Sequence, residues 1–596
     1  MHPALDLEAK VDAILARADD ETLPAVPASL YLDLAESIVR QAARLQAPDG
    51  HVDDLYGPPG VETSTATGRY AGAVAHLLRA GRCLDLLESA MAALDWCCDQ
   101  VVAAYREGRA WRGSGFYLKD ALVLYQVLAG TAPSDRMERW TRDLASYDPE
   151  QLYDGGHNWL FYNAAAEVVR IESGLSDRHD YVEQALASQL EQWTPFGMYR
   201  DPNDPVTYDL TVRQGLAFMF EHGWEGEHAG WAREMLRRGA LATLLFISPN
   251  GVAPYGGRSN QFHHMEAMIA YLAEWQAKEE ARRRNLRLAG ALRRMALAGA
   301  KAVRRWILQD PYFSLKHQMR AYPCHGHDRY NPTGSLHAAY GLLAANLFGG
   351  AHHCAATGIP MAPAPTDVGG YTLHLADAFY RVWATAGGYH LQIDTAGQPG
   401  YDATGLGRFH KRGAPVELAL NMSIVPDPKW HIAVANPRRA VAIGPGWPVA
   451  GAWRYLAEAN RESHAVAVTT REENSAVELA VTYQSRGDGL PGATEVRECY
   501  RLSDEGLRCR IEVPGAPQVH LQAPLLETDG QLRSEVTLAP GRATVRYAGH
   551  TYALHVPGCQ EGPWLEPWPA ANRNGIYRVA LFQVEGPALE YHAEIT

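Results

Sequence analysis

The chain has 596 residues, of which 47% are hydrophobic and 21% are charged. This composition is ordinary for a folded soluble protein, and the length exceeds what one hydrophobic core organises, so two domains are expected. The formal net charge of −13 argues against a protein that coats nucleic acid or an anionic membrane. It does not exclude a small anionic substrate, because a cleft can be basic in a chain that is acidic overall.

Cysteine usage and the first residues bear on metal sites and on compartment. The eight cysteines are scattered and no CxxC pair occurs, which argues against a thiolate zinc site. The start, MHPALDLEAK, lacks the basic and then apolar pattern of a signal peptide, and no apolar run reaches the ~18 residues of a membrane span. We therefore expect a cytoplasmic protein, or a periplasmic or secreted one if a leader has been removed.

Helical periodicity runs through residues 1–355. Its clearest example places apolar residues three or four apart on one face: Leu84, Leu87, Met91, Leu94, Cys98 and Val101. Clusters such as YGPPG and DPNDP separate similar runs. About a dozen helices joined by alternating short and long loops favour an α/α toroid of about six helical hairpins, whose inner helices line a central cavity. A superhelical repeat array is the alternative, although no motif recurs at a fixed period.

The pattern changes after residues 356–370, a segment rich in proline and glycine that we interpret as a linker. Beyond it apolar and polar residues alternate, as at Val477, Leu479 and Val481, which is typical of half-buried antiparallel strands. Turn motifs such as RGDGLPG and SDEG separate these runs. We expect residues 371–596 to form an antiparallel β-sandwich, which makes the fold class α+β with a helical catalytic domain first.

The first polar cluster is YDGGHNWLFYN, residues 153–163. Two glycines, with their free backbone dihedral angles, lead into an apolar-periodic run, so that His157, Asn158 and Trp159 stand at the mouth of a helix. Polar and aromatic groups at a helix start can hold a sugar or an anion. The plainer interpretation makes Asn158 a helix cap and Trp159 part of the core.

A second cluster is FGMYRDPNDPVTYDLTVRQG, residues 196–215. A loop of proline and aspartate leads into a helix that begins near Tyr208. On the next face of that helix Asp209 and Arg213 form an i,i+4 acid–base pair. The plainer interpretation is a helix start with a surface ion pair.

A third cluster, SPNGVAPYGGRSNQFHHMEAM, spans residues 248–268. Two glycines again precede a helix start, and Arg258 follows them with a planar guanidinium that suits a carboxylate. More polar groups open this helix than a cap requires: Asn260, His263 and His264. Adjacent helix residues point about 100° apart, so at most one of the two histidines faces a substrate.

Two further segments complete the set of candidates. The loop AYPCHGHDRYNPTG, residues 321–334, carries Tyr330 as a candidate cleft residue, and a metal is a weaker possibility at His325, His327 and Asp328. The segment QPGYDATGLGRFHKRG, residues 398–413, lies in the β-domain and carries Tyr401, Arg408 and His410. As a loop it can close the cleft from the other side, and the alternative is a solvated hairpin.

These features together resemble polysaccharide lyases of the heparinase II/III, chondroitin AC and oligo-alginate lyase type. The resemblance covers most of the chain as an architecture, and as sequence it rests on HNW at 157–159, on the tyrosine of TYDLTVR at 208, and on the segment 401–410. The stretch GGRSNQFHHME, residues 256–266, is similar to uronate-active relatives such as lyases for rhamnose–glucuronate linkages. These lyases usually show asparagine and then histidine; the order here is the reverse, which leaves the roles of the two residues open.

The resemblance implies β-elimination beside a uronic acid, on a uronate-containing glycan and without a cofactor. Asn158, with His157 or Arg258, would neutralise the carboxylate and stabilise the enolate-like charge. The base would be Tyr208, assisted by Arg213, or a histidine such as His264. The acid would be Tyr401 or Tyr208. Substrate contacts are expected from Trp159, Arg213, Arg258, Asn260, His263, Tyr330, Arg408 and His410.

Two other functions stay open from the sequence. A glycoside hydrolase such as a glucuronidase on the same scaffold needs two carboxylic acids in the cleft, for which Asp154, Asp209 and Glu266 are available. A non-catalytic glycan-binding protein is the second alternative. The polymer, the endo or exo mode of cleavage and the oligomeric state do not follow from the residues.

Overall fold

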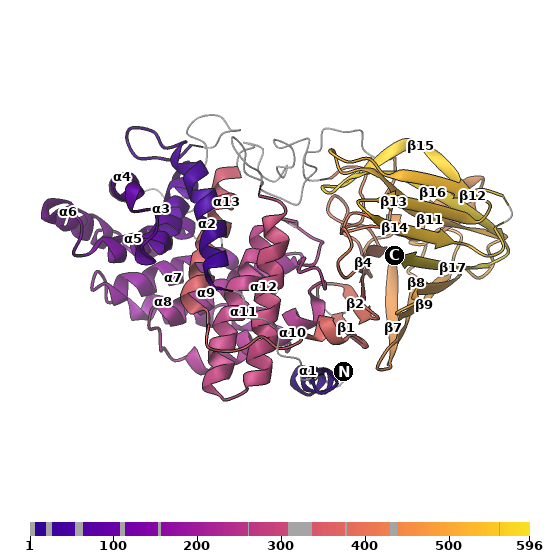
Figure 1. The fold of residues 1–596 in the computed structure, drawn as a ribbon, viewed down its shortest axis with the longest axis horizontal. Helices are drawn as coiled ribbons and strands as arrows, with labels where there is room; N and C mark the ends of the chain where they lie inside the picture. The colour runs from indigo at the N-terminus through magenta and orange to yellow at the C-terminus, as the bar shows by residue number, and fades with distance from the viewer. Residues whose placement is uncertain are drawn as a thin grey trace.

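The computed structural model of the chain describes residues 6–19, 27–53, 63–107, 114–152, 156–259, 261–307, 337–375, 378–428, 438–559 and 561–596. Helices form its N-terminal part and strands its C-terminal part (Figure 1). None of the helices in these ranges has both the length and the apolar character that crossing a bilayer requires.

In the described part of the chain, six helices form a closed ring in which each contacts the next and the last contacts the first. These inner helices are α3 (Thr63–Arg79), α5 (Ser114–Leu128), α7 (Asn158–Glu172), α9 (Val206–Glu221), α11 (His264–Arg282) and α13 (His337–Cys354). The helices that alternate with them along the chain are α2 (Ser29–Ala43), α4 (Leu87–Arg106), α6 (Ser134–Ala145), α8 (His179–Ala187), α10 (Ala229–Phe246) and α12 (Leu286–Arg304). The expected α/α toroid is therefore present, and α1 (Leu7–Leu15) packs on α10.

The inner helices are buried nearly all round, as their position in the ring requires. In α9 every residue from Val206 to Met219 is buried except Tyr208, which is half-buried. Because an outer helix returns the chain after each inner one, the inner helices run in the same direction and their N-termini share one end of the ring. That end collects the partly positive termini of six helix dipoles.

The strands of the C-terminal part form three antiparallel sheets. The first, in the order β1-β2-β3-β4, consists of β1 (Tyr371–Leu375), β2 (Arg381–Ala386), β3 (Tyr389–Asp394) and β4 (Gly405–Lys411). The second, in the order β12-β13-β14-β17-β10-β9-β8-β7, consists of β7 (His464–Glu472), β8 (Val477–Ser485), β9 (Glu495–Ser503), β10 (Gly506–Glu512), β12 (Glu535–Ala539), β13 (Arg542–Tyr547), β14 (His550–His555) and β17 (Ala588–Ile595). The third, in the order β15-β16-β11-β5-β6, consists of β5 (Gly444–Val449), β6 (Ala452–Tyr455), β11 (Gln518–Thr528), β15 (Trp564–Ala571) and β16 (Ile576–Glu585).

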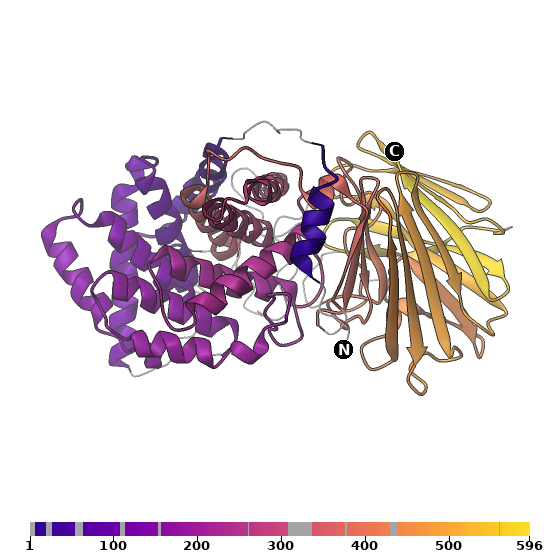
Figure 2. The ribbon, with the colours of Figure 1, turned by 90° about the horizontal axis from the view of Figure 1, so that it is seen from below.

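The four-stranded sheet lies between the helical ring and the two larger sheets (Figures 1 and 2). The last long helix ends at Cys354, the short helix α14 (Pro365–Val368) follows, and β1 begins at Tyr371. In β8 the residues Val477, Leu479 and Val481 are buried and alternate with partly exposed ones. The strands of the four-stranded sheet are instead buried on both faces because the helical domain covers the side turned away from the larger sheets.

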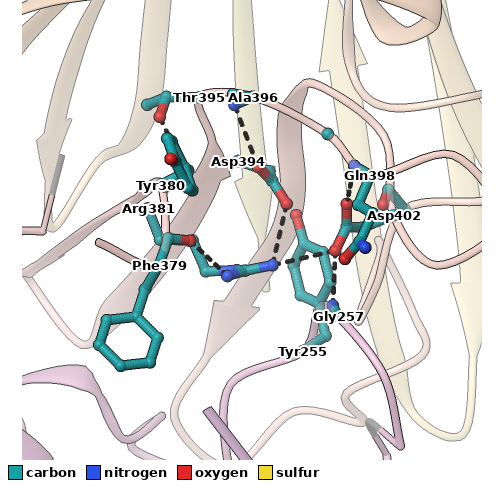
Figure 3. A network of polar contacts seen from close by, with 12 residues as sticks. Tyr255, Gly257, Phe379, Tyr380, Arg381, Asp394, Thr395, Ala396, Gln398 and Asp402 are labelled. Atoms are coloured by element: carbon teal, nitrogen blue, oxygen red, sulfur yellow. Dashed lines mark hydrogen bonds and ion pairs between the residues drawn. The ribbon is translucent and has the colours of Figure 1, made fainter. Parts of the chain in front are cut away.

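A buried charge network joins this sheet to the helical domain (Figure 3). Arg381 on β2 donates from Nη2 to Asp394 Oδ2 at 3.2 Å and to Asp402 Oδ2 at 2.9 Å. The same Asp402 oxygen accepts the N–H of Gly257, which precedes α11, at 2.6 Å. Burial and the charge of Asp402 raise the pKa of Asp394 to about 8, against the opposing effect of Arg381. A turn of the helical domain is thus held by carboxylates of the β-domain.

A substitution at Gly256, the neighbour of Gly257, tests the contact between this turn and Arg381. Gly256 has φ +113, and a Cβ atom there would lie 1.9 Å from Arg381 Nη2. We expect Gly256→Ala to lower the free energy of unfolding by about 3 kcal/mol or more, because backbone strain adds to a clash with a fixed guanidinium. In the control Gly388→Ala, φ is +79 and no atom lies within 4 Å, so only strain of about 1 kcal/mol is expected. Equal losses in urea denaturation would contradict this account.

A buried carboxyl in the β-domain predicts how stability depends on pH. Glu498 on β9 is 0% exposed, and burial raises the pKa of this carboxyl to about 7. The native state therefore keeps a proton that the unfolded chain releases, and stability falls as pH rises from about 4.5 to 7. We expect Glu498→Gln to change stability little near about pH 5 and to raise it by ~3 kcal/mol above about pH 8. Thermal unfolding of the wild type and of Glu498→Gln at both pH values checks this prediction. An equal gain in stability of the variant at both pH values would refute it.

Candidate functional site

The N-terminal ends of the inner helices bring several predicted residues to one end of the ring. Each of the six helices contributes a polar or aromatic side chain within its first turns: Arg69, Phe116, Asn158, Tyr208, His264 and Tyr340. Three of them, Asn158, Tyr208 and His264, are residues that the sequence singled out. They come together because the inner helices run in the same direction. No local sequence pattern predicts that arrangement.

Asp201 organises the centre of this end. It is 1% exposed, and one of its oxygens accepts a hydrogen bond from Asn158 Nδ2 at 2.8 Å. Its other oxygen forms an ion pair with Arg258. The Arg258 guanidinium in turn lies 4.2 Å from the centre of the Tyr208 ring, and the Tyr208 hydroxyl is 3.2 Å from Ser259 Oγ. We call Asn158, Asp201, Tyr208 and Arg258 the Asp201 cluster.

Sequence reasoning missed Asp201 as a functional residue. It lies in the loop quoted before Tyr208, and its partners Asn158 and Arg258 are 43 and 57 residues away in the chain. A run of proline and aspartate before a helix predicts a turn, so nothing local marked this carboxylate as the anchor of two distant side chains.

His157 and Asn158 keep unused polar atoms at the start of α7. His157 has φ 54 and ψ −128, a rare backbone conformation for a residue other than glycine. Its Nδ1 atom and the Asn158 Oδ1 atom are buried and have no hydrogen-bond partner among the residues that the structure describes. Buried polar atoms of this kind are normally satisfied, so a bound ligand or water is expected to satisfy them.

Aromatic rings flank the cluster. Trp159 packs on Phe116 with 4.1 Å between ring centres, and Phe116 also contacts Tyr162 at 4.8 Å. His264 stacks on Tyr340 at 5.1 Å with 27° between the ring planes. Half-buried rings of this kind offer apolar faces to sugar rings, as the sequence predicts for Trp159. His264 is 4% exposed and His263 is fully buried, so the base proposed among the histidines lies in packed surroundings.

Arg213 is separated from the Asp201 cluster. Its Nε atom donates to both oxygens of Asp209 at 3.1 Å, and both of its Nη atoms donate to Thr243 on α10. The predicted i,i+4 pair is present, but it is fully buried and serves the packing of α9 on α10. The cation beside Tyr208 is therefore Arg258, which corrects the expectation that Arg213 assists this tyrosine.

The segment 398–413 corrects a second expectation, because residues Gly405–Lys411 form strand β4 and the segment is neither a free loop nor a solvated hairpin. Burial on both faces removes the polar–apolar alternation that would have marked a strand. Arg408 donates to Ala253 O at 2.9 Å, and His410 Nδ1 lies 2.9 Å from Ser248 Oγ. Burial lowers the pKa of Arg408 to about 10 and holds the pKa of His410 well below its usual range.

These contacts place the β-domain candidates behind the turn that carries Arg258. Tyr401 is 8% exposed and packs in a small apolar cluster with Tyr255. With Arg408 and His410 it lies on the side of the β-domain that packs against residues 248–257. Several candidates lie outside the described residues: Asp154, Asn260, His325, His327, Asp328 and Tyr330. Within the described ranges no group of three or more histidine, cysteine, aspartate or glutamate side chains is placed to hold a metal.

Comparison with known proteins identifies the architecture. No family model and no curated protein matches the sequence. Among solved structures, the chain is similar to chondroitin AC lyase of Streptomyces coelicolor A3, crystallised with chondroitin sulphate, with a TM-score of 0.50 and 13% identity over 98% of this chain and 83% of that chain. A chondroitinase AC lyase studied with oligosaccharides has a TM-score of 0.42, 10% identity, and coverage of 98% and 82%. A glycosyl hydrolase family 88 protein of Bacteroides vulgatus has a TM-score of 0.36, 12% identity, and coverage of 55% and 99%. The first similarity shows that the chain has the toroid and antiparallel-sheet fold of a chondroitin AC lyase.

Proposed function

We propose that the chain is a lyase that cleaves a glycan next to a uronic acid by β-elimination. The observation that carries the proposal is the Asp201 cluster, in which Asn158 and Arg258 are fixed on one carboxylate and Arg258 lies over the Tyr208 ring. β-Elimination needs a group that neutralises the uronate carboxylate, a base for the C-5 proton and an acid for the departing O-4 oxygen.

The cluster contains a candidate for each task. Arg258, together with Asn158 and His157, faces the carboxylate and stabilises the charge that develops on it. Tyr208 as phenolate takes the C-5 proton, since a guanidinium beside a phenol favours the phenolate. The C-4–O-4 bond then breaks with its electron pair on O-4, and the Tyr208 hydroxyl returns the proton to that oxygen. In this scheme Tyr208 serves as both base and acid, so Tyr401 is not needed as the acid.

The surroundings of the cluster support an anionic sugar. The inner-helix N-termini present partly positive N–H groups, which favour a carboxylate at this end of the ring. The rings of Trp159 and Phe116 provide a stacking surface beside it. A uronate-containing substrate also agrees with the chondroitin sulphate bound by the S. coelicolor enzyme of the same fold.

The glycoside hydrolase alternative has weaker support among the described residues. Asp209 is tied to Arg213, and Glu266 is fully buried and accepts the Ala253 N–H at 2.8 Å. Both carboxylates therefore serve packing. A hydrolase needs two carboxylic acids that face the glycosidic bond, and Asp201 already binds two side chains.

The proposal predicts an absorbing product and its dependence on one hydroxyl group. A panel of uronate-containing glycans is incubated with the protein, and the unsaturated uronate is followed by its ultraviolet absorbance. We expect Tyr208→Phe to lower kcat by about 100-fold or more, because the base and acid are lost while the ring stays in place. The control is Tyr105→Phe, since Tyr105 is 49% exposed on α4. New reducing ends without absorbance would indicate a hydrolase, and full activity of Tyr208→Phe would refute the assignment.

A further inference from the structure

Arg69 on α3 is a buried guanidinium that has no acidic partner among the residues that the structure describes. It is 4% exposed, and its Nη1 atom donates one hydrogen bond, to Ala339 O at 3.0 Å. Its Nε atom is buried without a hydrogen-bond partner, and it forms no ion pair with any carboxylate among the described residues. Burial of a charge costs free energy unless a partner compensates it.

The other buried arginines show how the fold normally meets this requirement. Five of them pair with carboxylates of described residues: Arg170 with Glu167, Arg213 with Asp209, Arg237 with Glu8 and Glu280, Arg293 with Glu274, and Arg381 with Asp394 and Asp402. Arg408 lacks a carboxylate but donates to two backbone carbonyls, those of Asn421 and Ala253. Arg69 donates to a single backbone carbonyl, that of Ala339, so its charge is less compensated than that of Arg408.

The position of Arg69 relates it to the Asp201 cluster. Its guanidinium lies 5.8 Å from the centre of the Phe116 ring and 5.2 Å from that of Tyr340. Phe116 contacts Trp159 at 4.1 Å, and Trp159 is the neighbour of Asn158 in the chain. A chain of contacts therefore runs from Arg69 through Phe116 to Trp159, next to Asn158 of the Asp201 cluster, at the same end of the ring. A sugar stacked on these rings would therefore have one flanking sugar near Arg69 and the other near Arg258.

The two arginines differ in charge balance. Arg258 shares its charge with Asp201, whereas Arg69 has no carboxylate partner among the described residues and keeps its full charge for a ligand. We propose that Arg69 binds an acidic group, a carboxylate or a sulfate, on a sugar adjacent to the uronate that reacts. The substrate is then a glycan with negative charge on at least two neighbouring residues. This inference rests on the proposed function for the identity of the site, while the anion binding itself can be tested without turnover.

The first test uses anion binding and stability. Thermal unfolding is measured in sodium sulfate and in sodium chloride of equal ionic strength for the wild type and for Arg69→Met. We expect sulfate to raise the Tm of the wild type more than that of Arg69→Met. In chloride, Arg69→Met should keep or raise the Tm, because it removes an uncompensated buried charge. The matched control Arg79→Met removes an exposed charge from the other end of the same helix and should respond to sulfate like the wild type.

The outcomes of this test are decisive in both directions. If sulfate stabilises the wild type and Arg69→Met equally, Arg69 is no anion site and the inference is overturned. If Arg69→Met unfolds at a much lower temperature in chloride, the guanidinium has a structural role and the inference is likewise overturned. Neither outcome depends on whether the protein cleaves a glycan, so failure of the proposed function is distinguishable from failure of the inference.

The second test uses the cleaved glycan. Oligosaccharides with and without an acidic group next to the reacting uronate, such as sulfated and unsulfated chondroitin fragments, are compared. We expect Arg69→Gln to raise KM about tenfold or more for the doubly charged form, with a smaller effect on kcat, since one charge-assisted contact is lost. The singly charged form should be nearly unaffected, and Arg69→Lys should restore part of the preference. An equal rise in KM for both forms would overturn the inference.

Discussion

The contact between Gly257 and Asp402 is the constraint on which the candidate site depends. This hydrogen bond crosses from the helical ring to the β-domain. Arg381 holds Asp402 in place and binds Asp394 through the same Nη2 atom. Because Arg258 directly follows this turn, the β-domain determines where that guanidinium stands relative to Tyr208. The β-domain thus takes part in building the proposed catalytic end of the ring, although it contributes none of the residues of the Asp201 cluster.

A second constraint is the parallel direction of the inner helices. It concentrates six N-termini at one end of the ring, and these termini attract negative charge. The chain as a whole carries −13, so the proposed affinity for an anionic substrate requires a locally positive region. The structure provides this locally positive region through helix termini, through Arg258 on its carboxylate anchor and through Arg69.

Carboxylates and arginines serve two purposes in this fold. Pairs such as Arg213 with Asp209 and Arg293 with Glu274 are buried and make packing contacts between helices or within one. At the proposed catalytic end the balance of charges differs, because Asp201 binds two partners and Arg69 binds no carboxylate among the described residues. Uncompensated polar groups destabilise a fold, and those at this end of the ring, His157 Nδ1, Asn158 Oδ1 and Arg69 Nε, are the ones that a charged ligand would satisfy.

Local patterns in the sequence determined much of this protein. Helical periodicity around Leu84–Val101 and strand alternation around Val477 predicted the two kinds of structure. Glycine-led helix starts marked Asn158 and Arg258, and a loop of proline and aspartate before a helix marked Tyr208. These signals are local because hydrogen bonding in helices and the side-chain period of strands are set by residues close in the chain. The tertiary structure alone decided that Asp201 joins Asn158 to Arg258, that Arg213 is buried against α10, that 405–411 is a strand and that Arg69 has no carboxylate partner within the described ranges. Each of these facts depends on contacts between residues far apart in the chain, such as the 145 positions between Gly257 and Asp402, and no local pattern encodes such a contact.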